Sequence, residues 1–201
     1  GDFTTKSGRK TPYFINTGRF NTGEKISRLG EFYAEHLVTL GLDKQANIIF
    51  GPAYKGIPLC VSTAASLSTK FRSNIGFTFD RKEVKEHGDG GRFVGSPLNN
   101  SSKVILVEDV ITAGTTMREI VPLLRGIPGL ELLGAVIAVD RSERGTEKLS
   151  AVQEVQQNLN LPVYPIITIH DIVAYLNSKR PSWFSADLDS RIQGYIAEYG
   201  A

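Results

Sequence analysis

Apolar residues recur along the chain with two different periods, and these periods predict a succession of strands and helices. Five short apolar runs bounded by turn-forming residues are typical of buried strands; they occupy residues 47–50, 76–79, 104–107, 133–139 and 163–167. Apolar positions three and four residues apart predict helices; these occupy residues 25–40, 57–69, 117–124, 147–159, 170–177 and 188–199. Strands that alternate with helices predict an α/β fold, with a central, mostly parallel sheet flanked by helices.

Residues 81–95 interrupt this alternation, because they have neither the strand period nor the helix period. The segment contains four glycines and a mixture of basic and acidic side chains. Long loops in compact domains are usually functional or disordered. Two interpretations stay open: a solvated surface loop, or a mobile lid whose Arg and Lys side chains close over a polyanion.

Composition narrows the class of protein. The 201 residues suffice for one domain with a sizeable core, and 41% hydrophobic and 22% charged residues are typical of soluble globular proteins. The net charge of +2 gives no sign of nucleic-acid binding, and a single cysteine, Cys60, excludes internal disulfides. The sequence has no apolar run of ~20 residues and no signal-peptide pattern. We therefore expect a cytoplasmic protein that does not span a membrane.

The most informative stretch follows the apolar run at residues 104–107. Two adjacent carboxylates, Glu108 and Asp109, come directly after this strand, and a loop rich in Gly and Thr then leads into a helix. Such a loop is typical of an anion and sugar site at the carboxyl end of a parallel strand. In the alternative interpretation, Thr116 and Glu119 form a capping box that only starts the helix. The acid pair favours a site, because two such carboxylates need a neutral member, hydroxyl groups or a cation.

A second loop of this kind, residues 51–56, follows the strand at residues 47–50. Its backbone N–H groups and the charge of Lys55 suit a phosphate, although a tight turn with a solvated lysine is the alternative. Two common nucleotide motifs are missing. Phe93 stands at the third glycine of a dinucleotide fingerprint, and Ile57 stands at the lysine of a P-loop. Neither a Rossmann dehydrogenase nor a P-loop NTPase is supported.

The N-terminal segment, residues 3–16, interleaves basic and aromatic side chains. It suits either a basic surface arm or a surface that stacks on and pairs with a flat anionic ring. Among the three histidines, His87 in the glycine-rich segment is the functional candidate. No spacing of His, Cys and Asp residues predicts a metal site built by the protein.

Together these four segments resemble the orotate phosphoribosyltransferases, a family of type I phosphoribosyltransferases. The resemblance covers nearly the whole chain, and residues 6–14 (Lys-Ser-Gly-Arg-Lys-Thr-Pro-Tyr-Phe) and 81–88 (Arg-Lys-Glu-Val-Lys-Glu-His-Gly) carry it most specifically. It implies a type I phosphoribosyltransferase fold in one domain over residues 1–201, with a small N-terminal hood at residues 1–21 and a catalytic lid at residues 81–95. Similar enzymes transfer ribose 5-phosphate from 5-phosphoribosyl 1-diphosphate (PRPP) to orotate in pyrimidine (UMP) biosynthesis. They form orotidine 5′-monophosphate and pyrophosphate, with Mg²⁺.

The resemblance also implies roles for individual residues. Those expected to be catalytic are Lys82, Lys85, His87 and Asp109. The expected 5′-phosphate loop consists of Thr112, Ala113, Gly114, Thr115 and Thr116, and Glu108 and Asp109 would face the ribose. Val110 and Ile111, which lie between these two groups, are also expected to bind substrate. Pyrophosphate would contact Tyr54, Lys55, Arg81, Lys82, Lys85 and His87, and orotate would contact Lys6, Phe14, Ile15 and Arg141. Glu108 departs from the Asp-Asp pair of many bacterial relatives, so the resemblance does not fix its individual role.

Similar enzymes also imply a metal ion and an oligomer. Mg²⁺ would be bound mainly through PRPP, with Asp109 reaching it through water. The expected assembly is a homodimer in which lid residues are shared across the interface. Two alternatives are a purine or uracil phosphoribosyltransferase and a PRPP-sensing regulator that binds nucleic acid. The hood and Arg141, which offer positive charge to a carboxylate, argue against the first, and the near-neutral net charge and intact lid argue against the second.

Overall fold

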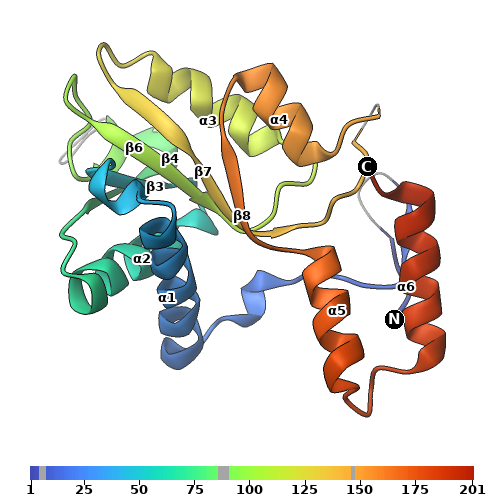
Figure 1. Cartoon of the computed structure of the whole chain (residues 1–201). Helices are drawn as coiled ribbons and strands as arrows, with labels where there is room; N and C mark the ends of the chain where they lie inside the picture. The colour runs from blue at the N-terminus through green and yellow to red at the C-terminus, as the bar shows by residue number, and fades with distance from the viewer. Residues whose placement is uncertain (5–7, 86–90, 146–147) are drawn as a thin grey trace.

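A six-stranded sheet forms the centre of the computed structural model, which describes residues 1–4, 8–85, 91–145 and 148–201 (Figure 1). The strand order is β5-β4-β3-β6-β7-β8. The strands are β3 (Ile48–Gly51), β4 (Gly76–Lys85), β5 (Gly91–Gly95), β6 (Lys103–Glu108), β7 (Glu131–Asp140) and β8 (Val163–Thr168). All neighbouring strands pair in parallel except β4 and β5. The predicted α/β fold with a mostly parallel sheet is confirmed.

The unbroken apolar run of β6 reflects its position inside the sheet. Val104, Ile105, Leu106 and Val107 are all fully buried. Because successive side chains of a strand point to opposite faces, Ile105 and Val107 enter one apolar core while Val104 and Leu106 enter another. A sheet buried on both faces needs a layer of helices on each.

Two helices cover each face of the sheet (Figure 1). Helices α1 (Gly23–Thr39) and α2 (Gly56–Phe71) lie on one face, and α3 (Thr115–Arg125) and α4 (Ala151–Leu159) lie on the other. No helix in the described part of the chain is long and apolar enough to cross a membrane.

Helix α4 begins later than the periodicity predicts, at Ala151 instead of residue 147. The Ser150 side chain accepts a hydrogen bond from the Gln153 backbone N at 3.1 Å, and the Gln153 side chain accepts one from the Ser150 backbone N at 2.8 Å. This capping box satisfies two N–H groups that the helix itself leaves unpaired, and it therefore fixes the start of the helix.

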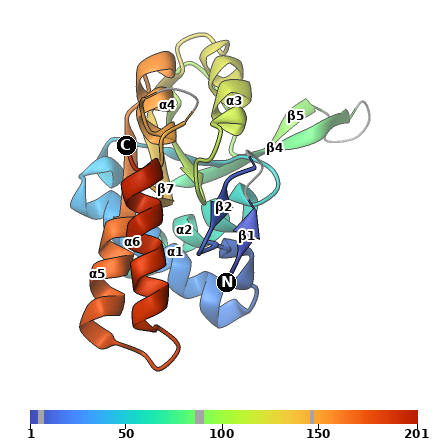
Figure 2. The same cartoon turned by 90° about the vertical axis from the view of Figure 1, so that its right-hand side faces the viewer.

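The N-terminal segment packs against the last helix. The remaining elements are β1 (Phe3–Thr4), β2 (Lys10–Thr11), α5 (Ile169–Lys179), α6 (Ala186–Tyr199) and two 3-10 turns at Thr17–Arg19 and Leu42–Lys44. Strands β1 and β2 pair antiparallel and lie beside α6 (Figures 1 and 2). The ring of Tyr13 meets the ring of Tyr195 edge-on at 5.6 Å, and the Arg9 guanidinium lies over the ring of Tyr199. Aromatic contacts thus join the expected hood segment to the C-terminal helix.

The prediction of a long loop at residues 81–95 is wrong for most of that segment. Strand β4 continues to Lys85, and β5 pairs with it antiparallel, with Asp80 opposite Phe93 and Lys85 opposite Gly91. The ribbon extends away from the body of the molecule (Figure 2). Its strands lack the apolar alternation because backbone hydrogen bonds, rather than burial of one face, hold an exposed edge ribbon together. Residues 86–90 lie outside the described part of the chain.

Candidate active site

The carboxyl ends of β3, β4, β6 and β7 meet at one edge of the sheet, and the expected site residues follow these ends. The loop after β3 is pinned to β4, because the Ala53 backbone N donates to Asp80 Oδ1 at 2.7 Å. Its two glycines lie against each other: a Cβ atom on Gly51 would lie 2.0 Å from the Gly56 carbonyl oxygen. Only glycine fits this approach, so the two glycines let the chain turn tightly from strand to helix.

Asp109 is the centre where three segments meet. Lys55 Nζ donates to Asp109 Oδ2 at 2.8 Å, and Thr17 Oγ1 donates to the same oxygen at 2.6 Å. The Val110 backbone N donates to Asp109 Oδ1 at 2.8 Å. The structure therefore brings the predicted phosphate lysine and the predicted ribose acid together, and it adds a hydroxyl group from the 3-10 turn after the hood.

The two neighbouring carboxylates have different electrostatic surroundings. Burial raises the pKa of Glu108 to about 7, and the negative charge of Asp109 adds to this shift. Burial also acts to raise the pKa of Asp109, but the hydrogen bonds from Lys55 and Thr17 outweigh it and hold that pKa below its usual value. At neutral pH, Glu108 is therefore partly protonated while Asp109 is ionised. This difference reduces the repulsion between the two adjacent buried carboxylates.

The loop after Asp109 leads into an open helix start. Gly114, with φ of +68°, is the N-cap of α3 and makes no side-chain cap. Thr116 lies inside the first turn of the helix, so the alternative in which it caps the helix is wrong. The first N–H groups of α3 therefore keep their donor capacity and the positive end of the helix dipole, which together suit an anion.

The other expected substrate-binding residues of this segment divide into two groups. Thr112, Ala113 and Thr115 are exposed. Val110 and Ile111 instead pack against the two apolar cores on opposite faces of the sheet. These two side chains anchor the loop, so only their backbone groups are left to meet a ligand.

The expected base-binding residues come from the hood and from the end of β7. Phe14 is exposed and stacks with the Phe3 ring at 5.6 Å, while Ile15 packs against the core beneath α1 and α2. Arg141 is largely buried and donates from Nε and Nη2 to Glu143 Oε1 at 2.9 and 2.5 Å. Burial acts to lower the pKa of Arg141, but the Glu143 carboxylate outweighs it and the pKa is raised.

Of the lid residues expected to contact pyrophosphate, only Arg81 and Lys82 have side chains in the described part of the chain. Arg81 and Lys82 lie on β4, where Arg81 Nη1 donates across the ribbon to the Gly91 carbonyl at 3.0 Å. Tyr54 is 72% exposed. Lys6 and His87 lie outside the described residues, as does the side chain of Lys85.

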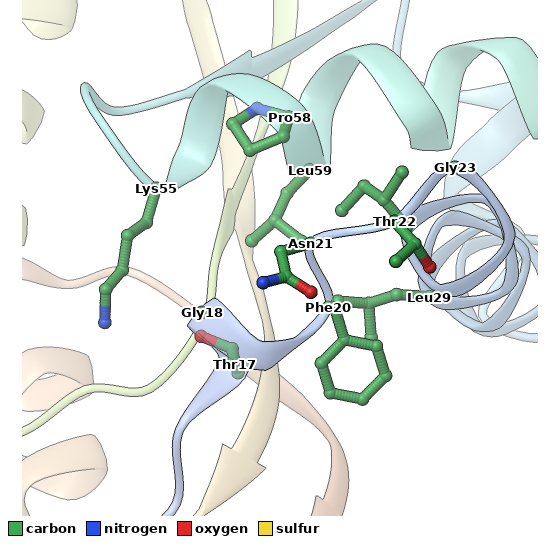
Figure 3. A pocket seen from close by; sticks show the side chains of 11 residues that line it. Thr17, Gly18, Phe20, Asn21, Thr22, Gly23, Leu29, Lys55, Pro58 and Leu59 are labelled. Carbon is green, nitrogen blue, oxygen red and sulfur yellow. The ribbon is translucent and has the colours of Figure 1, made fainter.

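A hollow of about 430 Å³ opens beside Lys55, between the 3-10 turn and the first turns of α1 and α2 (Figure 3). Figure 3 shows Lys55 extending from the start of α2 toward Thr17 and Gly18. Apolar side chains from α1 and α2, such as Leu29, Pro58 and Leu59, also line the hollow. Within the described ranges, no group of three or more His, Cys, Asp or Glu side chains is placed to hold a metal ion.

Four residues of this region escaped the sequence-based expectations. Thr17 is 92 positions from Asp109 and belongs to no motif, so no local signal points to it. Tyr33, whose hydroxyl donates to the Glu108 carbonyl oxygen at 2.6 Å, appears in the sequence only as one of two aromatics on an amphipathic helix. Glu143 appears there only as a charged neighbour of Arg141. Asp80 does carry a signal, because it is an acid directly after an apolar strand, as Asp109 is.

Comparisons with known proteins agree with this geometry. Residues 17–166 match the phosphoribosyl transferase domain model. The chain is 47% identical over 210 residues to the orotate phosphoribosyltransferase of Bifidobacterium longum (strain NCC 2705), covering all of this chain and 91% of that protein. It is 46% identical over 200 residues to that of Escherichia coli O139:H28, covering all of this chain and 90% of that protein. The crystal structure of the Francisella tularensis orotate phosphoribosyltransferase matches with a TM-score of 0.84 at 35% identity, over all of this chain and 93% of that one. The chain therefore belongs to the orotate phosphoribosyltransferase family and has its type I phosphoribosyltransferase fold.

Proposed function

We propose that this chain transfers ribose 5-phosphate from PRPP to N1 of orotate, giving orotidine 5′-monophosphate and pyrophosphate in pyrimidine (UMP) synthesis. The observation that carries the proposal is the position of Asp109 between two anion-binding segments. Lys55 lies on one side of it, and the open start of α3 follows it on the other. PRPP has a matching form, because its ribose lies between a 5′-phosphate and a 1-diphosphate.

Binding of PRPP places a different group on each segment. The N–H groups at the start of α3, with the hydroxyls of Thr112, Thr115 and Thr116, hold the 5′-phosphate. Asp109 accepts hydrogen bonds from the ribose hydroxyls, and Lys55 exchanges its contact with Asp109 for the negative diphosphate. This exchange leaves neither the exposed Lys55 ammonium nor the buried Asp109 carboxylate without a partner.

Catalysis then depends on position and charge. As pyrophosphate departs, the ribose acquires oxocarbenium character, which a nearby carboxylate stabilises. Asp109 is suited to this because the hydrogen bonds from Thr17 Oγ1 and the Val110 backbone N, together with those from the ribose hydroxyls that replace Lys55, favour its ionised form. Burial instead raises the pKa of the neighbouring Glu108 to about 7. The deprotonated N1 of orotate attacks C1′ of the ribose, the carbon that pyrophosphate leaves. No nucleophile from the protein is therefore required. Arg141 holds the orotate carboxylate, and Lys6, Phe14 and Ile15 close over the ring.

Residues of segment 81–95 are proposed to bind the leaving group, pyrophosphate. Arg81, Lys82, Lys85 and His87 neutralise the departing pyrophosphate and exclude water while the ribose is reactive. In a homodimer, the ribbon of one subunit supplies part of this set to its neighbour. We place this dimer in the cytoplasm.

Mg²⁺ fits the same edge of the sheet, because Asp109 offers an ionised carboxylate and hard cations bind oxygen ligands. The ion would be held mainly by the oxygens of PRPP, with Asp109 contacting it through water. When bound, it would supply positive charge beside the diphosphate.

The test is a comparison of bases in one assay. Orotate, uracil and hypoxanthine are each mixed with the protein, PRPP and Mg²⁺, and consumption of the base is followed by its ultraviolet absorbance. The proposal expects turnover of orotate and a kcat/KM at least ~100-fold lower for uracil, because a site built around a charged hydrogen bond rejects a base without the carboxylate. Equal turnover of uracil would contradict the assigned substrate.

A further inference from the structure

A single carboxylate holds the guanidinium of Arg141. Nε and Nη2 both donate to Glu143 Oε1, and the two side chains are only 10% and 15% exposed. A guanidinium has five N–H donors in a rigid fork. Glu143 occupies the Nε edge of this fork, and no partner for Nη1 is recorded in the described part of the chain. The end that carries Nη1 is therefore fixed in direction and keeps its donors.

Tyr13 holds the same carboxylate from the hood. Its hydroxyl donates to Glu143 Oε1 at 2.6 Å, and the Arg141 guanidinium carbon lies 4.9 Å from the centre of its ring. Burial, together with the hydrogen bond to Glu143, raises the pKa of Tyr13, so its hydroxyl stays protonated and remains a donor. Because Phe14 and Ile15 follow Tyr13 directly, Glu143 links both parts of the proposed orotate pocket.

The backbone of Glu143 is fixed from two sides. Its carbonyl oxygen accepts a hydrogen bond from the Ala151 backbone N at 3.3 Å, at the start of α4. Glu143 also forms an isolated antiparallel bridge with Gly200, just after α6. Because its backbone is constrained, the Glu143 carboxylate can fix the orientation of the longer Arg141 side chain through their hydrogen bonds.

We propose that Glu143 and Tyr13 are positioning residues that aim the Nη1 end of Arg141 at the carboxylate of the bound base. The inference rests on the proposed function, because it assumes that this base is orotate. Glu143 also cancels the charge of Arg141, so direction and not net charge is the property that these contacts supply. A fork held in place loses less side-chain entropy when it binds a carboxylate.

Glu143→Asp separates position from charge. The substitution keeps the negative charge but withdraws the carboxylate by one methylene from both Arg141 and Tyr13. We expect the KM for orotate to rise about 10-fold, in line with loss of part of a charged hydrogen bond, while kcat and the KM for PRPP stay within about 2-fold. Glu131→Asp is the matched control, because Glu131 forms an exposed ion pair with Lys103 at the far end of β7.

The effect must also depend on Arg141. In an Arg141→Gln background, Glu143→Asp should change kcat/KM for orotate by less than about 2-fold, because residues that act through one another are not additive. An unchanged KM for orotate, an equal rise in the KM for PRPP, or an effect that persists without Arg141 would each overturn the inference.

Tyr13→Phe supplies a second test that does not depend on the folding of Glu143→Asp. It removes only the hydroxyl, and we expect the KM for orotate to rise at least about 3-fold because the carboxylate of Glu143 loses the donor that Tyr13 supplies and is held by Arg141 alone of the two. No rise would overturn the role of Tyr13. Failure of the wild-type protein to turn over orotate would overturn the proposed function itself. Normal wild-type turnover with unaffected variants would overturn only the positioning role.

Discussion

Thr17→Val tests whether the hydroxyl group at the Asp109 centre contributes to PRPP binding. Valine has nearly the shape of threonine, so the substitution removes one donor to Asp109 Oδ2 and little else. The bond is short, at 2.6 Å, and its acceptor is charged. Hydrogen bonds to charged groups contribute roughly 1.5–3 kcal/mol. Thr17 is only half-buried and Lys55 still contacts the same oxygen, so the lower end of this range applies.

A loss of about 1.4 kcal/mol corresponds to a 10-fold fall in kcat/KM for PRPP. The assay is the initial rate at limiting PRPP and saturating orotate. The KM for orotate should stay within about 2-fold, because no recorded contact joins Thr17 to Arg141 or to its partners Glu143 and Tyr13. Thr39→Val is the matched control, since its hydroxyl donates to the Glu35 backbone carbonyl on the exposed side of α1. If Thr17→Val leaves kcat/KM for PRPP unchanged, or if the control falls equally, the role assigned to Thr17 is wrong.

Three further predictions follow from the same edge of the sheet. Asp80→Ala leaves the Ala53 N–H without its partner; it should lower the free energy of unfolding by ~1–3 kcal/mol in urea titrations and raise the KM for PRPP. Gly51→Ala places a Cβ atom too close to the Gly56 carbonyl oxygen and therefore displaces the loop that carries Lys55. Activity should fall at least ~100-fold, because a displacement of about 1 Å can lower the rate by that factor; retained activity would contradict the packing. Burial raises the pKa of Glu108 from 4.5 to about 7, so the folded state binds the extra proton between these pH values and stability falls as pH rises through them. Relative to Glu108→Gln, the wild type should lose on the order of 3 kcal/mol from pH 4.5 to 7 in denaturant titrations; parallel stability curves would refute the shift.

The central sheet was predictable because strands that are buried on both faces consist of apolar residues. In β6, residues 104–107 are all apolar because helices cover both faces of the strand. Such an unbroken apolar run is recognisable in the sequence. The β4–β5 ribbon had no such signal. It is held by backbone hydrogen bonds at the sheet edge, and its side chains reflect solvent and ligand instead of a core. The start of α4 was missed because the capping residue Ser150, not the apolar period, determines it.

The site was predictable where its residues follow strands directly. Asp109 and Lys55 each come just after a buried strand, and the parallel sheet brings these strand ends together. The likeness to the family was confirmed, and so was the α/β fold. Contacts made across the fold were not accessible in the same way. The contacts of Thr17 with Asp109 and of Tyr13 with Glu143 join positions 92 and 130 residues apart, and neither pair belongs to a motif.

The most direct measurement of the central claim is ³¹P NMR of the protein mixed with PRPP, orotate and Mg²⁺. The proposed transfer predicts that the PRPP signals are replaced by pyrophosphate and a new 5′-phosphate monoester in equal amounts, with one orotate consumed for each. Persistence of the PRPP signals would contradict the account. So would the release of pyrophosphate with free ribose 5-phosphate and unchanged orotate, because the site would then hydrolyse PRPP instead of transferring its ribose.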